Sequence, residues 1–136
     1  MQHINIAKIM IPKVFTSVLH ENDTVRQGLE SLLANGYTAV PVVDAGGQYL
    51  GSVTEGDFLR HIMSVGTTDK KQHEQYRLDS ILRKDFCPAI PITATEKEVT
   101  DAILNQNYVP IVDDRNTLCG ILTRKAVITY LAQRGT

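Results

Sequence analysis

The sequence predicts a mixed α/β (α+β) fold made of two similar halves, each with the order helix, strand, helix, strand, strand, helix. The main observation is an internal repeat: adding 69 to each position of 40–54 gives 109–123 without a gap, and six positions are identical. At roughly one chance identity in twenty positions, such a match is rare. The second observation is that β-prone runs and helix-period patterns recur in the same order in both halves. The chain is therefore interpreted as an internal duplication.

Composition describes an ordinary soluble globular protein. The 136 residues are 43% hydrophobic and 21% charged, enough to bury a core. A net charge of −1 argues against a domain whose main task is to bind nucleic acid, since such domains are usually strongly basic. No basic segment followed by an apolar run opens the chain, and no stretch approaches 18 apolar residues. We expect a cytoplasmic protein that binds neither nucleic acid nor membrane.

Catalytic and metal-binding patterns are missing from the sequence. Cys87 and Cys119 have no CxxC spacing and no nearby histidine, so we expect reduced thiols in or near the core. The scattered histidines are expected on the surface: His3, His20, His61 and His73. No P-loop, GxGxxG or GxSxG motif occurs. The sequence thus predicts no enzyme activity, no metal site and no catalytic cofactor.

The first half is assigned to residues 6–63. A short apolar pattern predicts a helix that Pro12 ends, and β-prone residues predict a strand over 14–19. Asp23 or Thr24 then caps a helix. Spacings of i, i+4, i+7 and i+8 predict one buried stripe on it: Val25, Leu29, Leu32 and Leu33.

A β-hairpin and a final helix complete this half. Strands are expected over 38–43 and 48–53, joined by a turn rich in glycine. Thr54 caps the helix that follows. Its expected buried residues are Phe58, Leu59, Ile62 and Met63.

Residues 64–77 carry few apolar side chains and no periodicity, which predicts a linker. The pattern then repeats over 78–132. Thr95 and Glu98 form a capping-box motif at the start of a helix, and Thr123 is expected to cap the last helix. The buried residues expected on that last helix are Val127, Ile128 and Leu131.

The repeated motifs resemble the CBS domain, which occurs as tandem pairs called Bateman modules. Both halves contain a hydrophobic-Pro-hydrophobic-hydrophobic-Asp strand, a hairpin and Gly-x-x-Thr before a helix, and the resemblance covers about residues 6–132. It implies two pseudo-symmetric βαββα repeats packed through their sheets. It also implies two clefts between the repeats that commonly hold adenine nucleotides, and a disc-like homodimer.

Thr54 and Asp57 are the clearest candidate ligand contacts. A threonine at a helix start offers its hydroxyl beside unpaired N–H groups, which suits a phosphate. Asp57, one turn further, has two oxygens that can accept from adjacent ribose hydroxyls, and the resemblance implies this role for Thr-x-x-Asp. The alternative is structural: Thr54 is only a cap and Asp57 only a favourable acid in the first turn.

The second copy keeps Thr123 but has Ala126 where the acid would be. Arg124 and Lys125 add positive charge beside a helix N-terminus, which the helix dipole disfavours unless an anion binds. The alternative is two solvated side chains.

The resemblance assigns two clefts, because the Thr motif of one copy meets the strands of the other. Cleft one would combine Thr54, Asp57, Ala89, Ile90, Asn107, Tyr108, Val109 and Pro110. Cleft two would combine Lys13, Phe15, Ser17, Tyr37, Thr38, Ala39, Pro41, Thr123, Arg124 and Lys125. The aromatic side chains of these sets either cover an adenine face or fill the core.

These features predict a non-catalytic sensor in which AMP, ADP or ATP acts as a regulatory ligand and an unidentified protein partner responds. A second hypothesis is a cyclic di-AMP receptor that uses Thr123, Arg124 and Lys125. It rests on similarity to small stand-alone CBS-pair proteins of Gram-positive bacteria, some of which bind that ligand. A third hypothesis is a ligand-free module that dimerises through helices 54–63 and 123–132.

Overall fold

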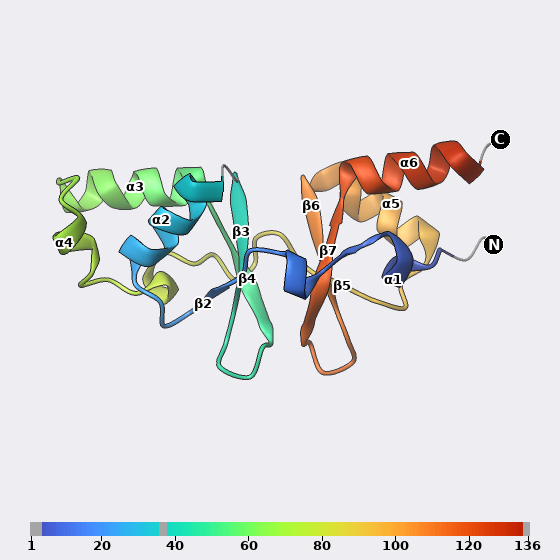
Figure 1. Cartoon of the computed structure of the whole chain (residues 1–136), viewed down its shortest axis with the longest axis horizontal. Coiled ribbons are helices and arrows are strands. Elements are labelled where there is room, and N and C mark those ends of the chain that lie inside the picture. The colour runs from blue at the N-terminus through green and yellow to red at the C-terminus, as the bar shows by residue number, and fades with distance from the viewer. Residues whose placement is uncertain (1–3, 36–37, 135–136) are drawn as a thin grey trace. The chain divides into compact units, whose positions relative to one another are not determined.

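The computed structural model describes residues 4–35 and 38–134, which form two compact units. The central unit is Ser17–Phe86, and the terminal unit combines Met1–Thr16 with Cys87–Thr136. Figure 1 shows the N-terminal segment, in blue, beside the C-terminal helix α6, in red. Residues 4–16 therefore pack with the second half of the sequence.

The central unit contains a three-stranded sheet in the order β2-β3-β4, with β2 parallel and β4 antiparallel to β3. Helices α2 and α3 pack on one side of this sheet (Figure 1). The elements are β2 (Leu19–His20), α2 (Val25–Asn35), β3 (Ala39–Val43), β4 (Tyr49–Thr54), α3 (Glu55–Val65), α4 (Lys70–His73) and the 3₁₀ helix η2 (Leu78–Ser80). Its core is made of Leu19, Val25, Leu32, Val40, Val42, Val53, Phe58 and Leu78.

The terminal unit repeats this plan with a four-stranded sheet in the order β1-β7-β6-β5. Its elements are α1 (Ile6–Ile9), β1 (Ile11–Pro12), η1 (Lys13–Phe15), β5 (Ile90–Pro91), α5 (Glu96–Asn105), β6 (Tyr108–Val112), β7 (Leu118–Thr123) and α6 (Arg124–Arg134). Its core is made of Ile4, Ile6, Ala94, Val99, Ile103, Val109, Ile111, Leu122 and Val127.

The two hairpins agree in detail. Asp44 Oδ1 accepts hydrogen bonds from two backbone N–H groups of its turn, each at 2.9 Å, and Asp113 Oδ1 does the same. Gly47 (φ 85°) and Asn116 (φ 63°) take the left-handed conformation at corresponding positions. The repeated aspartate is therefore explained by the turn it builds.

Gly51 and Gly120, which open the Gly-x-x-Thr motifs, allow a backbone segment to pass at close range. A Cβ atom on Gly51 would lie 2.7 Å from the carbonyl oxygen of Arg83, and one on Gly120 would lie closer still to that of Ile11. Ser52 forms an isolated bridge with Arg83, whereas β1 pairs with β7 through Ile11 and Ile121. Arg83 thus occupies in the central unit the place that Ile11 occupies in the terminal unit.

The predicted caps and the thiol state are confirmed. Thr54 and Thr95 both form complete capping boxes, and the Thr123 hydroxyl accepts from the Ala126 N–H at 3.1 Å. Both cysteines are free thiols; Cys87 is buried and Cys119 is partly buried.

The strand predicted over 14–19 is wrong for most of its length. Residues Lys13–Phe15 form a 3₁₀ turn, closed by the Thr16 N–H donating to the Lys13 carbonyl, and only Leu19–His20 pairs in a sheet. Val14 and Phe15 are 83% and 77% exposed. Neither apolar side chain therefore packs into a core, as it would in a strand of the sheet.

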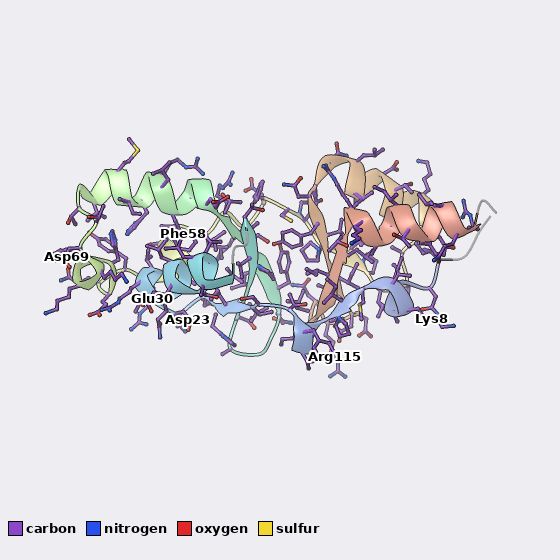
Figure 2. All side chains as sticks on the ribbon, turned by 45° about the horizontal axis from the view of Figure 1, so that its top comes forward. Lys8, Asp23, Glu30, Phe58, Asp69 and Arg115 are labelled. Atoms are coloured by element: carbon purple, nitrogen blue, oxygen red, sulfur yellow. The ribbon has the colours of Figure 1, made fainter. Side chains whose placement is uncertain are left out.

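Some predicted buried positions are also wrong. Leu59 and Met63 are 58% and 73% exposed on α3, and Leu33 and Ile128 are exposed on α2 and α6. The face that α3 buries consists of Asp57, Phe58 and His61 instead. Figure 2 shows the Phe58 side chain between α3 and α2.

Candidate functional site

Thr54 and Asp57 form a reciprocal pair at the start of α3. The Thr54 N–H and hydroxyl donate to Asp57 Oδ2 at 2.8 and 3.0 Å, and the Asp57 N–H donates back to Thr54 Oγ1 at 3.2 Å. Asp57 is only 4% exposed. The hydroxyl proton of Thr54 is thus already used within the protein.

Two arginines occupy the other side of the Asp57 carboxylate. Arg60 Nη2 donates to Oδ1 at 2.6 Å, Arg83 Nη2 donates to Oδ2 at 3.4 Å, and Arg83 Nε forms a salt bridge with Oδ1 at 2.9 Å. Burial by itself would raise the pKa of Asp57. The hydrogen bonds from Thr54, Arg60 and Arg83 outweigh burial and hold the pKa below its ordinary value. Asp57 is therefore an ionised acceptor with both oxygens engaged.

A cavity of about 450 Å³ adjoins this network, between one face of α3 and the segment 76–83. We call it the α3 groove. Its polar lining includes Asp57, Arg60, His61, Ser64, Tyr76, Ser80 and Arg83. Sequence reasoning missed both arginines, although the i, i+3 spacing of Asp57 and Arg60 was a readable signal.

A cavity of about 340 Å³ lies at the corresponding place in the terminal unit, between α6 and Ile9. Thr123, Lys125 and Ala126 line it. A shift of 69 relates Ala126 to Asp57, and relates the lining residue Thr129 to Arg60. The two units therefore carry equivalent cavities of different charge, which we distinguish as the α3 groove and the α6 cavity.

The two predicted cations of the second copy have different surroundings. Arg124 Nε donates to the Ile103 carbonyl at 3.0 Å, which ties the start of α6 to α5. Lys125 is exposed and lines the α6 cavity. Because position 126 is alanine, the Thr123 hydroxyl has no acid beside it, and among the described residues no acceptor for its proton is recorded.

The remaining predicted contacts are divided between the units. Thr54 and Asp57 lie in the central unit, whereas the other members of cleft one lie in the terminal unit. For cleft two, Lys13, Phe15, Thr123, Arg124 and Lys125 lie in the terminal unit, and Ser17, Thr38, Ala39 and Pro41 lie in the central unit. Tyr37 lies outside the described residues. Both clefts stay predictions.

Within the terminal unit, Lys13 and Thr123 lie at opposite ends of β7. Pro12 pairs with Gly120, which places Lys13 next to Cys119, four strand positions from Thr123. At about 3.3 Å per residue this is a separation of about 13 Å. This is the separation of the two backbone positions, and the long lysine side chain can span part of it.

His61 and His73 contradict the expectation of surface histidines: they are 8% and 1% exposed. The His73 Nε2 group lies 3.0 Å from the Thr67 carbonyl, which can only accept, so Nε2 carries a proton, and His73 Nδ1 shares a hydrogen bond with His61 Nε2 at 3.1 Å. His73 and α4 fall within the predicted linker 64–77. The hydrogen-bonded pair of buried rings therefore joins this segment to α3.

This pair predicts acid sensitivity. Burial, with a smaller contribution from nearby His73, lowers the pKa of His61 below its unfolded value. Unfolding then takes up a proton, so stability is fully present above about pH 6.5 and falls as the pH drops below it, by at most about 1.4 kcal/mol per pH unit. Urea titrations between pH 5 and 8 should show this slope. The His61→Gln variant should reduce it; an unchanged slope would contradict the assignment.

Among the described residues, no group of histidine, cysteine, aspartate and glutamate side chains is arranged to hold a metal ion. Within 4–35 and 38–134, no helix has the length and apolar character that a bilayer crossing requires.

Comparison with known proteins identifies the family. The model of the CBS domain matches residues 6–64 and 80–133. The chain belongs to the CBS-domain family. It is a tandem pair of CBS repeats with a mixed α+β fold, and pairs of this family are generally regulatory modules.

The chain spans about a quarter of one curated relative and nearly the whole of two similar solved structures. The chain is 25% identical over 138 residues to a homoserine O-acetyltransferase of Methanohalophilus mahii, covering 98% of this chain but only 26% of that protein. CbpB of Listeria monocytogenes in complex with c-di-AMP has a TM-score of 0.82 at 19% identity, covering 96% of this chain and 97% of that one. CBSX2 in complex with AMP has a TM-score of 0.77 at 21% identity, covering 97% and 98%.

Proposed function

We propose that the protein is a non-catalytic sensor that binds an adenine nucleotide, AMP, ADP or ATP, in a cleft shared by its two CBS repeats. Binding would favour one arrangement of the repeats, which a protein partner then recognises. A ligand acts in this way only through different affinities for the two arrangements. The cytoplasmic location, the homodimer and the partner stay predictions.

One observation carries the proposal: each repeat caps the helix that follows its hairpin with a threonine at the same position of the repeat. Backbone N–H groups at a helix start favour anions such as phosphates. Relatives of the same fold provide further support, because CbpB was solved with c-di-AMP and CBSX2 with AMP. Both ligands contain adenosine joined to phosphate.

Binding of ribose at Asp57 would require an exchange of partners. Both carboxylate oxygens are engaged, but Arg60 and Arg83 have side chains that are 65% and 43% exposed. Water can therefore solvate the guanidinium of either arginine after ribose hydroxyls have taken its place at the Asp57 carboxylate. Asp57 accepts hydrogen bonds both before and after the exchange, from the arginines first and from the ribose afterwards. The net free energy of the exchange is therefore the difference between two hydrogen-bond contributions of similar size.

The second copy favours cyclic di-AMP as an alternative ligand. Ala126 leaves the Thr123 hydroxyl available to donate, and Lys125 lines the α6 cavity with an exposed ammonium group. A ligand with two phosphates and no free ribose diol needs these groups and not an acid. Since Arg124 already holds the Ile103 carbonyl, Lys125 is the better cation to test.

A ligand-free dimerisation module is the third candidate. Leu59 and Met63 are exposed one turn apart on α3, and Ile128 is exposed on α6 at the position equivalent to Leu59. Exposed apolar side chains on a helix favour contact with another surface. This candidate requires that no nucleotide bind.

Calorimetry with AMP, ADP, ATP and cyclic di-AMP tests the proposal. Wild type should bind at least one of them. If AMP binds through Asp57, Asp57→Ala should weaken it about tenfold or more, because charge-assisted hydrogen bonds to the ribose are lost. The exposed acid Asp114 provides a control, since Asp114→Ala removes the same charge on a hairpin turn.

The outcomes separate the candidates. Binding of cyclic di-AMP alone, lost in Lys125→Ala but retained in Asp57→Ala, would favour the second candidate. No binding by any of the four ligands would defeat the sensor proposal and leave dimerisation.

A further inference from the structure

The α3 groove is complete within the central unit. Asp57, Arg60 and Ser64 line it from α3, at spacings of three and four residues that place them on one helical face. The segment after α4 contributes Tyr76, Ser80 and Arg83. The volume of about 450 Å³ falls within the range of about 300–1,000 Å³ that is usual for small-ligand cavities.

Positive charge exceeds negative charge in this groove. Arg60 and Arg83 share one carboxylate, and Asp57 is the only acid among the described lining residues. A guanidinium has five N–H donors. Arg60 donates one hydrogen bond to Asp57, and Arg83 contacts Asp57 through Nη2 and Nε, so both keep donors for a further acceptor. One negative charge does not neutralise two guanidiniums.

The neutral part of the lining suits an anion as well. Ser64 on α3 carries an exposed hydroxyl, and Tyr76 on the facing segment adds a phenol, whereas the Ser80 hydroxyl already donates to the Arg77 carbonyl at 2.7 Å. The Ser64 hydroxyl and the Tyr76 phenol can donate hydrogen bonds to phosphate oxygens. The lining therefore combines two fixed positive charges with two neutral donors.

The terminal unit shows that the fold does not require this network. Thr129 stands at the position of Arg60, Ala126 at that of Asp57, and Ile11 at that of Arg83. That unit nevertheless builds the same hairpin, helix and cavity. The arginine pair is therefore an addition to a common framework and points to a task beyond folding.

We propose that the α3 groove is an anion-binding site for a phosphate-bearing ligand, with Arg60 and Arg83 as its main donors. Asp57 holds both arginines in place when the groove contains no ligand, and competes with the incoming anion. The inference concerns residues 17–86 alone and does not rest on nucleotide binding in the cleft between the repeats.

Calorimetry with sodium pyrophosphate at constant ionic strength is the first test. Wild type should bind, and Arg60→Ala and Arg83→Gln should each weaken binding about tenfold or more, because a charge-assisted contact is lost. Arg26→Ala is the matched control: Arg26 lies in the same unit but pairs with Glu30 and Glu74, and its removal changes the net charge equally. That variant should bind like wild type.

Asp57→Asn gives the sharper test. Removing the competing charge should raise the affinity for pyrophosphate about tenfold, since a unit charge a few ångströms from the anion interacts at this order of magnitude. A merely structural role for the network predicts a loss or no change. Circular dichroism on each variant confirms that it is folded.

Competition with AMP identifies the source of the phosphate. If AMP displaces pyrophosphate, the groove holds a nucleotide's own phosphate; if both bind together, it holds a separate anion. Either result supports the inference. Absent pyrophosphate binding, or binding that Arg60→Ala leaves unchanged in a folded protein, overturns it. Pyrophosphate contains no adenine, so failure of every nucleotide to bind would defeat only the proposed function.

Discussion

Replacing Phe58 with alanine is expected to lower the free energy of unfolding by about 3–5 kcal/mol, the usual cost of removing a buried phenylalanine ring. Phe58, labelled in Figure 2, is 2% exposed. Its ring lies against Gly28 of α2. A Cβ atom on Gly28 would be 3.1 Å from Cζ of Phe58 and 2.8 Å from Leu78. The cavity left by alanine cannot close easily because backbone forms one wall.

Urea denaturation followed by circular dichroism measures this loss. The neighbouring residue provides the control: Leu59 is 58% exposed, so Leu59→Ala should change stability by no more than about 0.5 kcal/mol. Equal effects of the two substitutions would contradict the orientation of α3. Since α3 carries Asp57, the same packing holds the α3 groove in shape.

The sequence predicted well those features that short-range chemistry decides. Thr54 and Thr95 cap helices because the hydroxyl and the carboxylate three residues later each accept from one backbone N–H group. The hairpins were readable because their turns repeat in both halves. These features depend on neighbours within a few positions of the chain.

The residues that α3 buries could not be predicted from such short-range patterns. Apolar spacing selected Leu59 and Met63, whereas the structure buries two polar residues, Asp57 and His61. Burial of polar groups requires partners, and these come from His73 and Arg83, which are distant in the sequence. A helix-period rule scores hydrophobicity alone and therefore misses a face stabilised by hydrogen bonds.

The arginines around Asp57 show that the site, too, depends on contacts between residues distant in the sequence. Arg60 lies one turn from Asp57, but Arg83 reaches Asp57 only because its backbone bridges Ser52 at the place of β1. The predicted repeat aligns Asp57 with Ala126 and does not extend to this strand position. The pairing of the crossing segments, and not the motif itself, brings the second cation to the acid.

Gly120→Ala is expected to cost about 1–3 kcal/mol, the range for inserting a methyl group into a packed region. The new Cβ would overlap the carbonyl oxygen of Ile11, which is backbone and cannot rotate away. The ladder between β1 and β7 should then open, so amide hydrogen exchange at residues 9–13 should accelerate more than exchange in β6.

Gly46→Ala is the matched control for this substitution. A Cβ on Gly46 would meet only the Asp44 side chain, at 3.5 Å, which is ordinary van der Waals contact. Because alanine also restricts the unfolded chain, this variant should be neutral or slightly stabilising. If both alanine variants were equally stable, Ile11 would not lie against Gly120 in solution. The glycine of Gly-x-x-Thr would then have no steric reason to recur, and the packing of the N-terminal segment on β7 would have to be abandoned.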